Sequence, residues 1–252
     1  MTFLTGLFQK WSSPANISHL SINIESLVFR SYLVAVKAMF NLPTEAKAQA
    51  WLDSVKKLPI TYWERGATAW ERMPQEFTHD EQRIKIGSGD VAWRAAKQAI
   101  RAWKMFPSDW IKLSDTPQIE VGEQVLVIAR LLGLWWSNPA RIVYTVEEKD
   151  RFGFAYGTLP GHLEQGEELF LVERDAQGDV YYTLRVMSRP IWWAAKLFKS
   201  FARMQQARFR MESFLSMRAA LGQTASRIEK FPKSNPPSKQ RALQGYAMRA
   251  QA

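Results

Sequence analysis

The sequence predicts an α+β protein in which a curved antiparallel sheet of about six to seven strands grips a long C-terminal helix. Three observations predict this fold. Short apolar segments separated by turn residues recur between residues 110 and 187, which is typical of an antiparallel meander. A wide apolar face then recurs at helical spacing up to about residue 221. The chain of 252 residues is long enough to bury a core around these elements.

The first 58 residues are predicted to form an added helical segment. Residues 1–11 place apolar side chains on one helical face, which suits either a segment docked on the body or a short interfacial anchor. Residues 20–40 predict a second helix, interrupted by charged side chains. Thr44 is expected to cap a third helix over residues 45–57, because its side chain accepts hydrogen bonds from the first helical turn.

After this segment the apolar period changes. Ile60–Trp63 is predicted as a short strand, and residues 64–82 are expected to be irregular. Arg83–Ile86 alternates like a strand and ends at a glycine-containing turn. Asp90 is then expected to cap a helix over about residues 91–105.

A run of six strands and one long helix completes the predicted fold. The helix is expected over about residues 190–221, with Pro190 in its first turn and Gly222 as its stop. The domains are therefore the helical segment 1–58, the sheet-and-helix body 59–221, and a basic, disordered tail 222–252. The predicted strands are Trp110–Leu113, Gln124–Arg130, Arg141–Glu147, Phe152–Thr158, Glu168–Glu173 and Val180–Met187.

Composition excludes several classes of function. There are no cysteines and only three histidines, so we expect no thiolate or histidine-only metal site, and no cofactor fingerprint is present. The net charge is +10, of which residues 189–252 carry +11 and the rest −1. Such asymmetry suggests an anionic partner, which can be a membrane surface, nucleic acid or an acidic protein; the alternative is a merely solvated basic region. Nucleic acid is not expected, and the location is predicted to be cytoplasmic, with a membrane-peripheral position as the alternative.

The segment from Tyr156 to Phe170 carries the densest group of chemically useful residues. His162 lies close in sequence to Glu167 and Glu168, and a histidine beside carboxylates can transfer protons. These three residues are therefore candidate catalytic groups. The alternatives are a metal site, or a loop in which the same side chains only cap backbone groups.

A second cluster combines arginines with paired tryptophans between residues 129 and 144. Charged residues within otherwise apolar strands are typical of the few polar groups in a ligand pocket. The alternative is an aromatic core with partly exposed edges. The candidate ligand-binding residues are Trp103, Trp110, Arg130, Trp135, Asn138, Arg141, Tyr156, Thr158, Glu168 and Arg189.

The chain resembles uncharacterised protein family 0548, a domain of unknown function, over residues 59–221. The resemblance rests on ordered matches, among them Gly66-Ala-Thr68, Asn138-Pro-Ala-Arg141 and Gly153-Phe-Ala-Tyr-Gly-Thr-Leu-Pro-Gly-His162. The family implies no established activity. The order of strands and helices is also similar to the helix-grip fold of the START and Bet v 1 type, which implies a cavity between sheet and helix.

Three functions follow as hypotheses. The first is binding of a hydrophobic small molecule or lipid between the sheet and the C-terminal helix. The second is a peripheral membrane or scaffold protein that uses the basic C-terminal region. The third is an enzyme in which His162, Glu167 and Glu168 act as acid–base groups, although no nucleophile motif is present.

Overall fold

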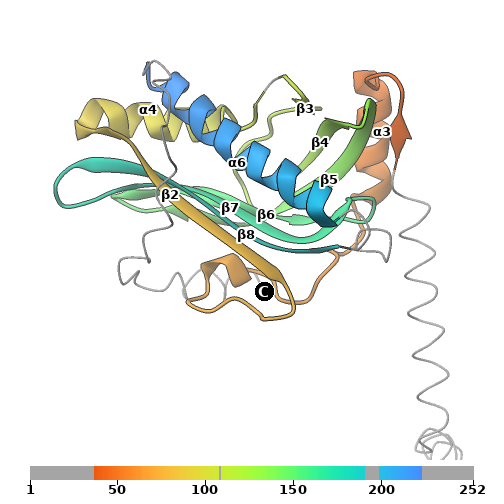
Figure 1. The fold of residues 1–252 in the computed structure, drawn as a ribbon, viewed down its shortest axis with the longest axis horizontal. Helices are drawn as coiled ribbons and strands as arrows, with labels where there is room; N and C mark the ends of the chain where they lie inside the picture. The colour runs from red at the N-terminus through yellow and green to blue at the C-terminus, as the bar shows by residue number, and fades with distance from the viewer. Residues whose placement is uncertain (1–36, 108, 191–198, 223–252) are drawn as a thin grey trace, which may run out of the picture.

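The structure, a computed structural model, describes residues 37–107, 109–190 and 199–222. The strands within these described ranges belong to one antiparallel sheet in the order β2-β8-β7-β6-β5-β4-β3, and the short β1 pairs with β5. Helices α4 and α6 lie on one side of this curved sheet, and the segment between α3 and β2 lies on the other (Figure 1). The predicted α+β fold with a gripped C-terminal helix is therefore confirmed.

β5 is the longest strand of the sheet. A register shift between Ile142 and Tyr144 adds a bulge to β5, and bulges bend a strand and increase its twist. The sheet consequently curves around α6. The elements are β1 (Ala38–Met39), α3 (Glu45–Val55), η1 (Ala67–Ala69), β2 (Thr78–Ser88), α4 (Gly89–Arg101), β3 (Ile111–Leu113), β4 (Gln124–Leu131), β5 (Leu134–Glu147), β6 (Arg151–Thr158), β7 (Glu164–Arg174), β8 (Asp179–Pro190) and α6 (Lys199–Ala220).

The curved sheet buries both of its faces. Its concave face, called here the inner face, packs against α4 and α6 through Phe154, Phe170 and Tyr182, all of them inaccessible to solvent. Its convex face, called the outer face, is covered by the segment 60–77 and, over β4, by α3. Alternate residues of each strand therefore serve different layers.

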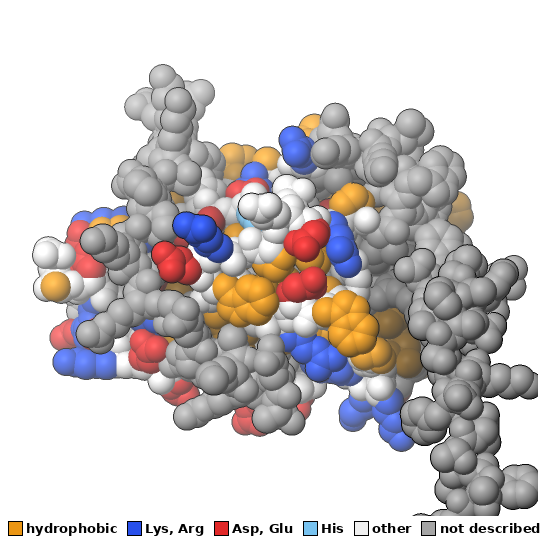
Figure 2. Space-filling view, turned by 90° about the horizontal axis from the view of Figure 1, so that it is seen from below, with side chains coloured by type: hydrophobic (Ala, Val, Ile, Leu, Met, Phe, Trp, Pro, Cys, Tyr) orange, Lys and Arg blue, Asp and Glu red, His pale blue; other side chains and the backbone are white. Residues whose placement is uncertain are grey.

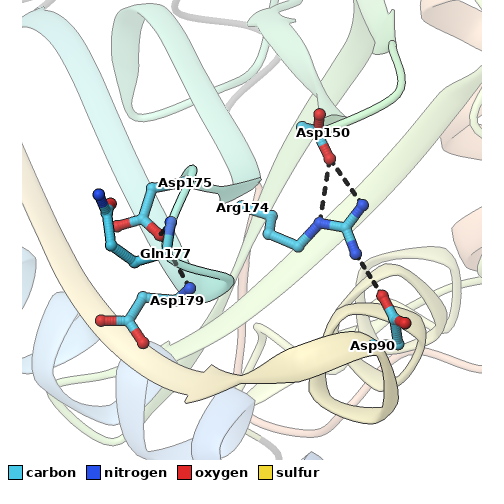
Figure 3. A network of polar contacts seen from close by, with 6 residues as sticks. All are labelled: Asp90, Asp150, Arg174, Asp175, Gln177 and Asp179. Atoms are coloured by element: carbon cyan, nitrogen blue, oxygen red, sulfur yellow. Dashed lines mark hydrogen bonds and ion pairs between the residues drawn. The ribbon is translucent and has the colours of Figure 1, made fainter.

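Arg174 ties together three elements at the far end of the sheet (Figure 3). Its guanidinium donates hydrogen bonds of 3.0 and 2.7 Å to Asp150 Oδ1 in the β5–β6 turn and pairs with Asp90 in the first turn of α4. Asp175 begins the turn between β7 and β8, where its carboxylate accepts the backbone N–H groups of Gln177 and Asp179. The loops at this end are thereby fixed to the sheet.

Three sequence predictions differ from the structure in the N-terminal half. Ile60–Trp63 is not a strand, because it lies across the outer face, where only Thr61 donates a backbone hydrogen bond to Thr158. β2 begins at Thr78 instead of Arg83, since its polar first half pairs with β8 without apolar alternation. The first helical turn of α4 includes Asp90, and Ser88 is the N-cap residue.

The other differences concern the ends of long elements. Residues 38–39 are extended and pair with β5, so the predicted helix over 20–40 does not reach its end; residues 1–36 lie outside the described chain. The paired tryptophans form part of β5, because the turn is made by Leu132 and Gly133, both with positive φ. Pro190 pairs with Glu164 at the end of β8 and does not begin the C-terminal helix. Of the predicted tail 222–252, residues 223–252 lie outside the description.

Candidate functional site

Polar side chains gather on the inner face near the first described turns of α6. Tyr156 of β6 and Glu168 of β7 are cross-strand partners, and the phenol donates a 2.6 Å hydrogen bond to Glu168 Oε2. Because residues two apart on a strand share a face, Glu164 is on the same face as Glu168. We call Tyr156, Glu164 and Glu168 the inner-face polar group.

Neighbouring elements complete the surroundings of this group. Gln206 of α6 donates hydrogen bonds of 2.9 and 3.0 Å to the two carboxylate oxygens of Glu164. Arg210, one turn further along α6, pairs with Asp80 of β2. The group therefore meets both an amide and a guanidinium from α6, but the guanidinium already has a carboxylate partner.

Burial among aromatic rings shifts the titration of these groups. Desolvation raises the pKa of Glu168 to about 7, and the hydrogen bond from Tyr156 opposes that rise. The nearby carboxylates of Glu164 and Asp80 raise the same pKa, while Arg210 lowers it. Burial likewise raises the pKa of Glu164. Glu168 can therefore exist in either protonation state near neutral pH, as an acceptor or as a donor.

An aromatic wall adjoins the inner-face polar group. The ring of Tyr156 lies 5.4 Å from that of Phe170 and 6.4 Å from that of Phe106, centroid to centroid. Phe209 of α6 packs on Phe106 at 5.7 Å, which joins the helix to this wall. A carboxyl and a phenol beside such rings provide an amphipathic surface that can bind an apolar molecule and orient its polar end.

Glu167 has a different role, since it faces the outer side. Only 2% of it is exposed. Its Oε2 accepts Tyr62 Oη and Gly66 N, each at 2.7 Å, and its Oε1 accepts Thr68 N at 2.9 Å and the Thr68 hydroxyl. Burial raises the pKa of Glu167 and these four hydrogen bonds lower it. We call Glu167 and its partners the outer-face anchor, because it fixes the segment 60–77 to β7.

Glycine at position 157 makes the outer-face anchor possible. A Cβ at Gly157 would lie 2.2 Å from Tyr62 Oη, so any other residue here would displace the phenol from Glu167. Arg185 supports the same segment by donating a 2.8 Å hydrogen bond to the carbonyl oxygen of Thr68. Residues that carry the family resemblance thus act here in holding two layers together.

His162 lies in the β6–β7 connection, apart from Glu167. Its Nδ1 accepts the backbone N–H of Glu164 at 3.0 Å, so the neutral ring carries its proton on Nε2. Burial lowers the pKa of His162 to about 4. The structure therefore separates the three predicted catalytic candidates: Glu168 faces inward, Glu167 faces outward, and His162 shapes a turn.

Several predicted ligand-binding residues contact the protein itself on the outer face. Arg141 donates hydrogen bonds of 2.6 and 3.0 Å to the carbonyl oxygens of Lys56 and Leu58. Arg189 donates to Gln165 and lies over the ring of Phe77. Arg130 is exposed, with its guanidinium 5.7 Å from the ring of Trp135. None of these arginines lies on the inner face with Glu168.

The remaining candidates make internal hydrogen bonds. Trp103 Nε1 donates to the carbonyl of Pro117 at 3.0 Å, and Trp110 Nε1 donates to Glu212 of α6. Asn138 is 6% exposed and its Oδ1 accepts the N–H of Leu163 at 3.3 Å. Thr158 accepts the N–H of Gly166 at 3.0 Å and its hydroxyl meets that of Thr61. These residues position the wall and the strands.

Sequence reasoning missed Glu164, Gln206 and Asp80. Glu164 and Glu168 are four residues apart, which is a same-face spacing in a strand, so the strand period was the available signal. The sequence contains no local signal that brings β2 and α6 to the same place, because both contacts span many residues.

Other features of the described residues set further bounds. A groove of about 590 Å³ lies between β2, α4 and the end of α6, but no predicted site residue lines it; Lys85, Ser88, Val91 and Leu221 do. Within residues 37–107, 109–190 and 199–222, no group of three histidine or acidic side chains is arranged to hold a metal ion. In the same ranges, the helices lack the length and apolarity needed to cross a bilayer.

The fold and the site together define a helix-grip α+β protein with an amphipathic inner face. Residues 61–216 match the sequence profile of a domain of unknown function, DUF1990, and the chain belongs to that family. A UPF0548 protein from Deinococcus radiodurans is 37% identical over 172 residues, which covers 64% of this chain and 84% of that relative. A UPF0548 protein from Dictyostelium discoideum is 35% identical over 160 residues, covering 58% and 74% respectively. The resemblance found in the sequence is thereby confirmed.

Solved structures are similar at much lower identity. A hypothetical protein from Helicobacter pylori is 13% identical, with a TM-score of 0.41, over 64% of this chain and 98% of that chain. Ara h 8.0201 is 11% identical, with a TM-score of 0.37, over 57% of this chain and 97% of that chain.

Proposed function

We propose that the protein binds a hydrophobic small molecule or lipid between the sheet and α6, with its polar end at the inner-face polar group. The observation that carries this proposal is the Tyr156–Glu168 hydrogen bond beside the rings of Phe106 and Phe170. A carboxyl with a pKa of about 7 on an apolar wall is typical of a binding or catalytic site. Glu168 Oε2 is occupied by the phenol, and its second oxygen is the one that would meet a ligand.

The chemistry of the site favours a ligand whose polar end donates hydrogen bonds. Glu164 and Glu168 supply carboxylate oxygens, which accept hydrogen bonds when ionised. Arg210, the cation of α6 that acts on Glu168, is paired with Asp80. A hydroxyl or amine would therefore be preferred over a carboxylate, which would meet like charge.

The experiment is organic extraction of the purified full-length chain, with mass spectrometry of the extract. We expect one class of amphipathic molecule in near-stoichiometric amount, and saturable binding of Nile red that the extracted molecule displaces. Glu168→Gln should alter the amount or class of the molecule, whereas Glu120→Gln, at an exposed position, should leave both unchanged. Extracts without any such molecule, together with no saturable Nile red binding, would refute the proposal.

A second candidate is proton transfer by Glu168 to a ligand at the same place. The specific observation is again its pKa of about 7, which lets one carboxyl act as acid and as base near neutral pH. Tyr156 would orient the reacting group. Conversion of the extracted molecule by wild-type protein, and its loss in Glu168→Gln with binding retained, would distinguish catalysis from binding alone.

A further inference from the structure

A basic, partly apolar surface lies on the outer side of the molecule, away from the inner-face polar group. Trp63 is 89% exposed and Leu58 is 40% exposed, although large apolar side chains are usually buried. Figure 2, which views the molecule from this side, shows hydrophobic side chains open to solvent, with lysine, arginine and acidic side chains around them. We call this surface the outer basic patch, and its members are Lys56, Lys57, Leu58, Trp63, Arg65 and Arg141.

The exposure of Trp63 follows from the outer-face anchor. Thr61 donates its backbone N–H to the carbonyl of Thr158 at 3.0 Å, and the Tyr62 phenol is held by Glu167 at 2.7 Å. Ile60 and Tyr62 pack into the outer core cluster. Because its neighbours are pinned inward on both sides, Trp63 is presented to solvent by a fixed backbone. The backbone at Trp63 is therefore fixed while its side chain projects into solvent.

The cations of the patch have no acidic partner within the described part of the chain. The ion pairs of that part include none of Lys56, Lys57, Arg65 and Arg141. Desolvation lowers the pKa of Arg141, and the positive charge of Arg65 lowers it further, while the Arg141 guanidinium donates to the carbonyl oxygens of Lys56 and Leu58 and to no carboxylate. Glu64 lies beside Arg65 in the chain but receives the N–H of Trp63. Such an arrangement attracts an anionic surface.

We propose that the outer basic patch docks on an anionic lipid bilayer, with Trp63 and Leu58 inserted at the headgroup level and the four cations against lipid phosphates and carboxylates. Tryptophan prefers the membrane interface, and each lysine near an anionic leaflet adds to binding. Nucleic acid would use the cations but would leave the aliphatic Leu58 without a partner. A bilayer uses both parts of the patch. This surface is distinct from the basic C-terminal region, most of which lies outside the described chain.

The test is flotation of the full-length chain with vesicles of phosphatidylcholine and phosphatidylserine in a 3:1 ratio, and with phosphatidylcholine alone. Lys56→Ala/Lys57→Ala should lower the partition coefficient on the anionic vesicles roughly 25-fold, at roughly fivefold per lysine. Trp63→Ala should lower it at least roughly tenfold, because the indole loses its interfacial burial. Charge-matched and apolar controls are Lys104→Ala/Lys149→Ala and Phe40→Ala, all at exposed positions outside the patch.

Each outcome decides the proposal. Loss of flotation in the patch variants, with the controls within roughly twofold of wild type and weaker binding at high salt, supports it. Equal flotation of wild type and patch variants overturns the proposal. It is also overturned if the patch variants float like wild type and only removal of residues 223–252 abolishes binding. Equal binding to both vesicle types also overturns it, as does binding to nucleic acid but to neither vesicle. Unchanged thermal midpoints would show that the exposed substitutions leave the fold intact.

Discussion

The adjacent residues Glu167 and Glu168 allow a sharp test of the two faces of the sheet. Glu167→Gln replaces one acceptor oxygen of the outer-face anchor with an NH₂ group. Each carboxylate oxygen accepts one backbone N–H and one hydroxyl. Oε2 accepts the N–H of Gly66 and the hydroxyl of Tyr62, and Oε1 accepts both groups from Thr68. A hydroxyl can rotate to accept from the new amide, but a backbone N–H cannot, so one buried donor loses its acceptor.

The magnitude follows from these contacts. A buried unsatisfied N–H costs about 1–3 kcal/mol, and hydrogen bonds to a neutral acceptor are weaker by about 1 kcal/mol than those to a charged one. We therefore expect Glu167→Gln to lower the free energy of unfolding by about 2–4 kcal/mol at pH 7. For a chain of this size that corresponds to a drop of roughly 5–15 °C in Tm. The matched control, Glu168→Gln, keeps a carbonyl to accept from Tyr156 and removes a carboxylate whose ionisation burial disfavours, so it should not lower the free energy of unfolding at pH 7.

Urea and thermal denaturation of the three proteins at pH 7 measure these differences. We expect Glu167→Gln to lower the free energy of unfolding more than Glu168→Gln does, although the two substitutions are neighbouring and chemically identical. A Glu167→Gln variant within about 1 kcal/mol of wild type would refute the four-donor anchor. A larger loss of stability from Glu168→Gln than from Glu167→Gln would show that the faces are assigned wrongly.

Two further predictions concern titration. Burial raises the pKa of Glu168 in the folded state to about 7, against about 4.5 in the unfolded chain. The stabilising contribution of Glu168 is therefore complete below about pH 4.5 and is lost as the pH rises to 7. In denaturation experiments, the unfolding free energy of wild type relative to that of Glu168→Gln should fall by up to about 3 kcal/mol across this window. A flat difference would contradict the assigned burial. The pKa of His162 is lowered to about 4, so its ring should stay neutral between pH 5 and 8. Its NMR signal can be assigned by its absence in His162→Asn. A change in the chemical shift of that signal near pH 6.5 would contradict the prediction.

The fold was predictable where apolar periodicity is local. The face of α4 that carries Trp93, Ala96 and Ile100 is buried as its helical spacing predicts. The six strands β3–β8 were found because each has its own apolar run and turn. The first half of β2 was missed, since its acidic side chains pair with Arg185 and Arg210 from distant elements. The interpretation of Pro190 failed because β8 continues beyond its apolar residues to pair with β7.

The candidate site was predictable only in part, for a related reason. The sequence brought His162, Glu167 and Glu168 together by proximity, but the side chains of consecutive strand residues point to opposite faces. The pairing register of β7 with its neighbouring strands was needed to place Glu167 on the outer face and Glu168 on the inner face. Gln206 and Asp80 join the site through tertiary contacts that leave no local pattern.

Glu167 and Glu168 have different roles on opposite faces of the sheet, and this difference affects how the family motifs should be interpreted. Gly66, Thr68 and Gly157 belong to the motifs that carry the family resemblance, and together with Tyr62 they contribute to the outer-face anchor around Glu167. An activity assay on variants of these residues would therefore report loss of folding as loss of function. Tyr156 and Glu168 have side chains on the other face and make one hydrogen bond to each other, so they can be changed with less effect on the fold. The function of this protein is best sought through that pair, with Glu167 variants as the measure of structural damage.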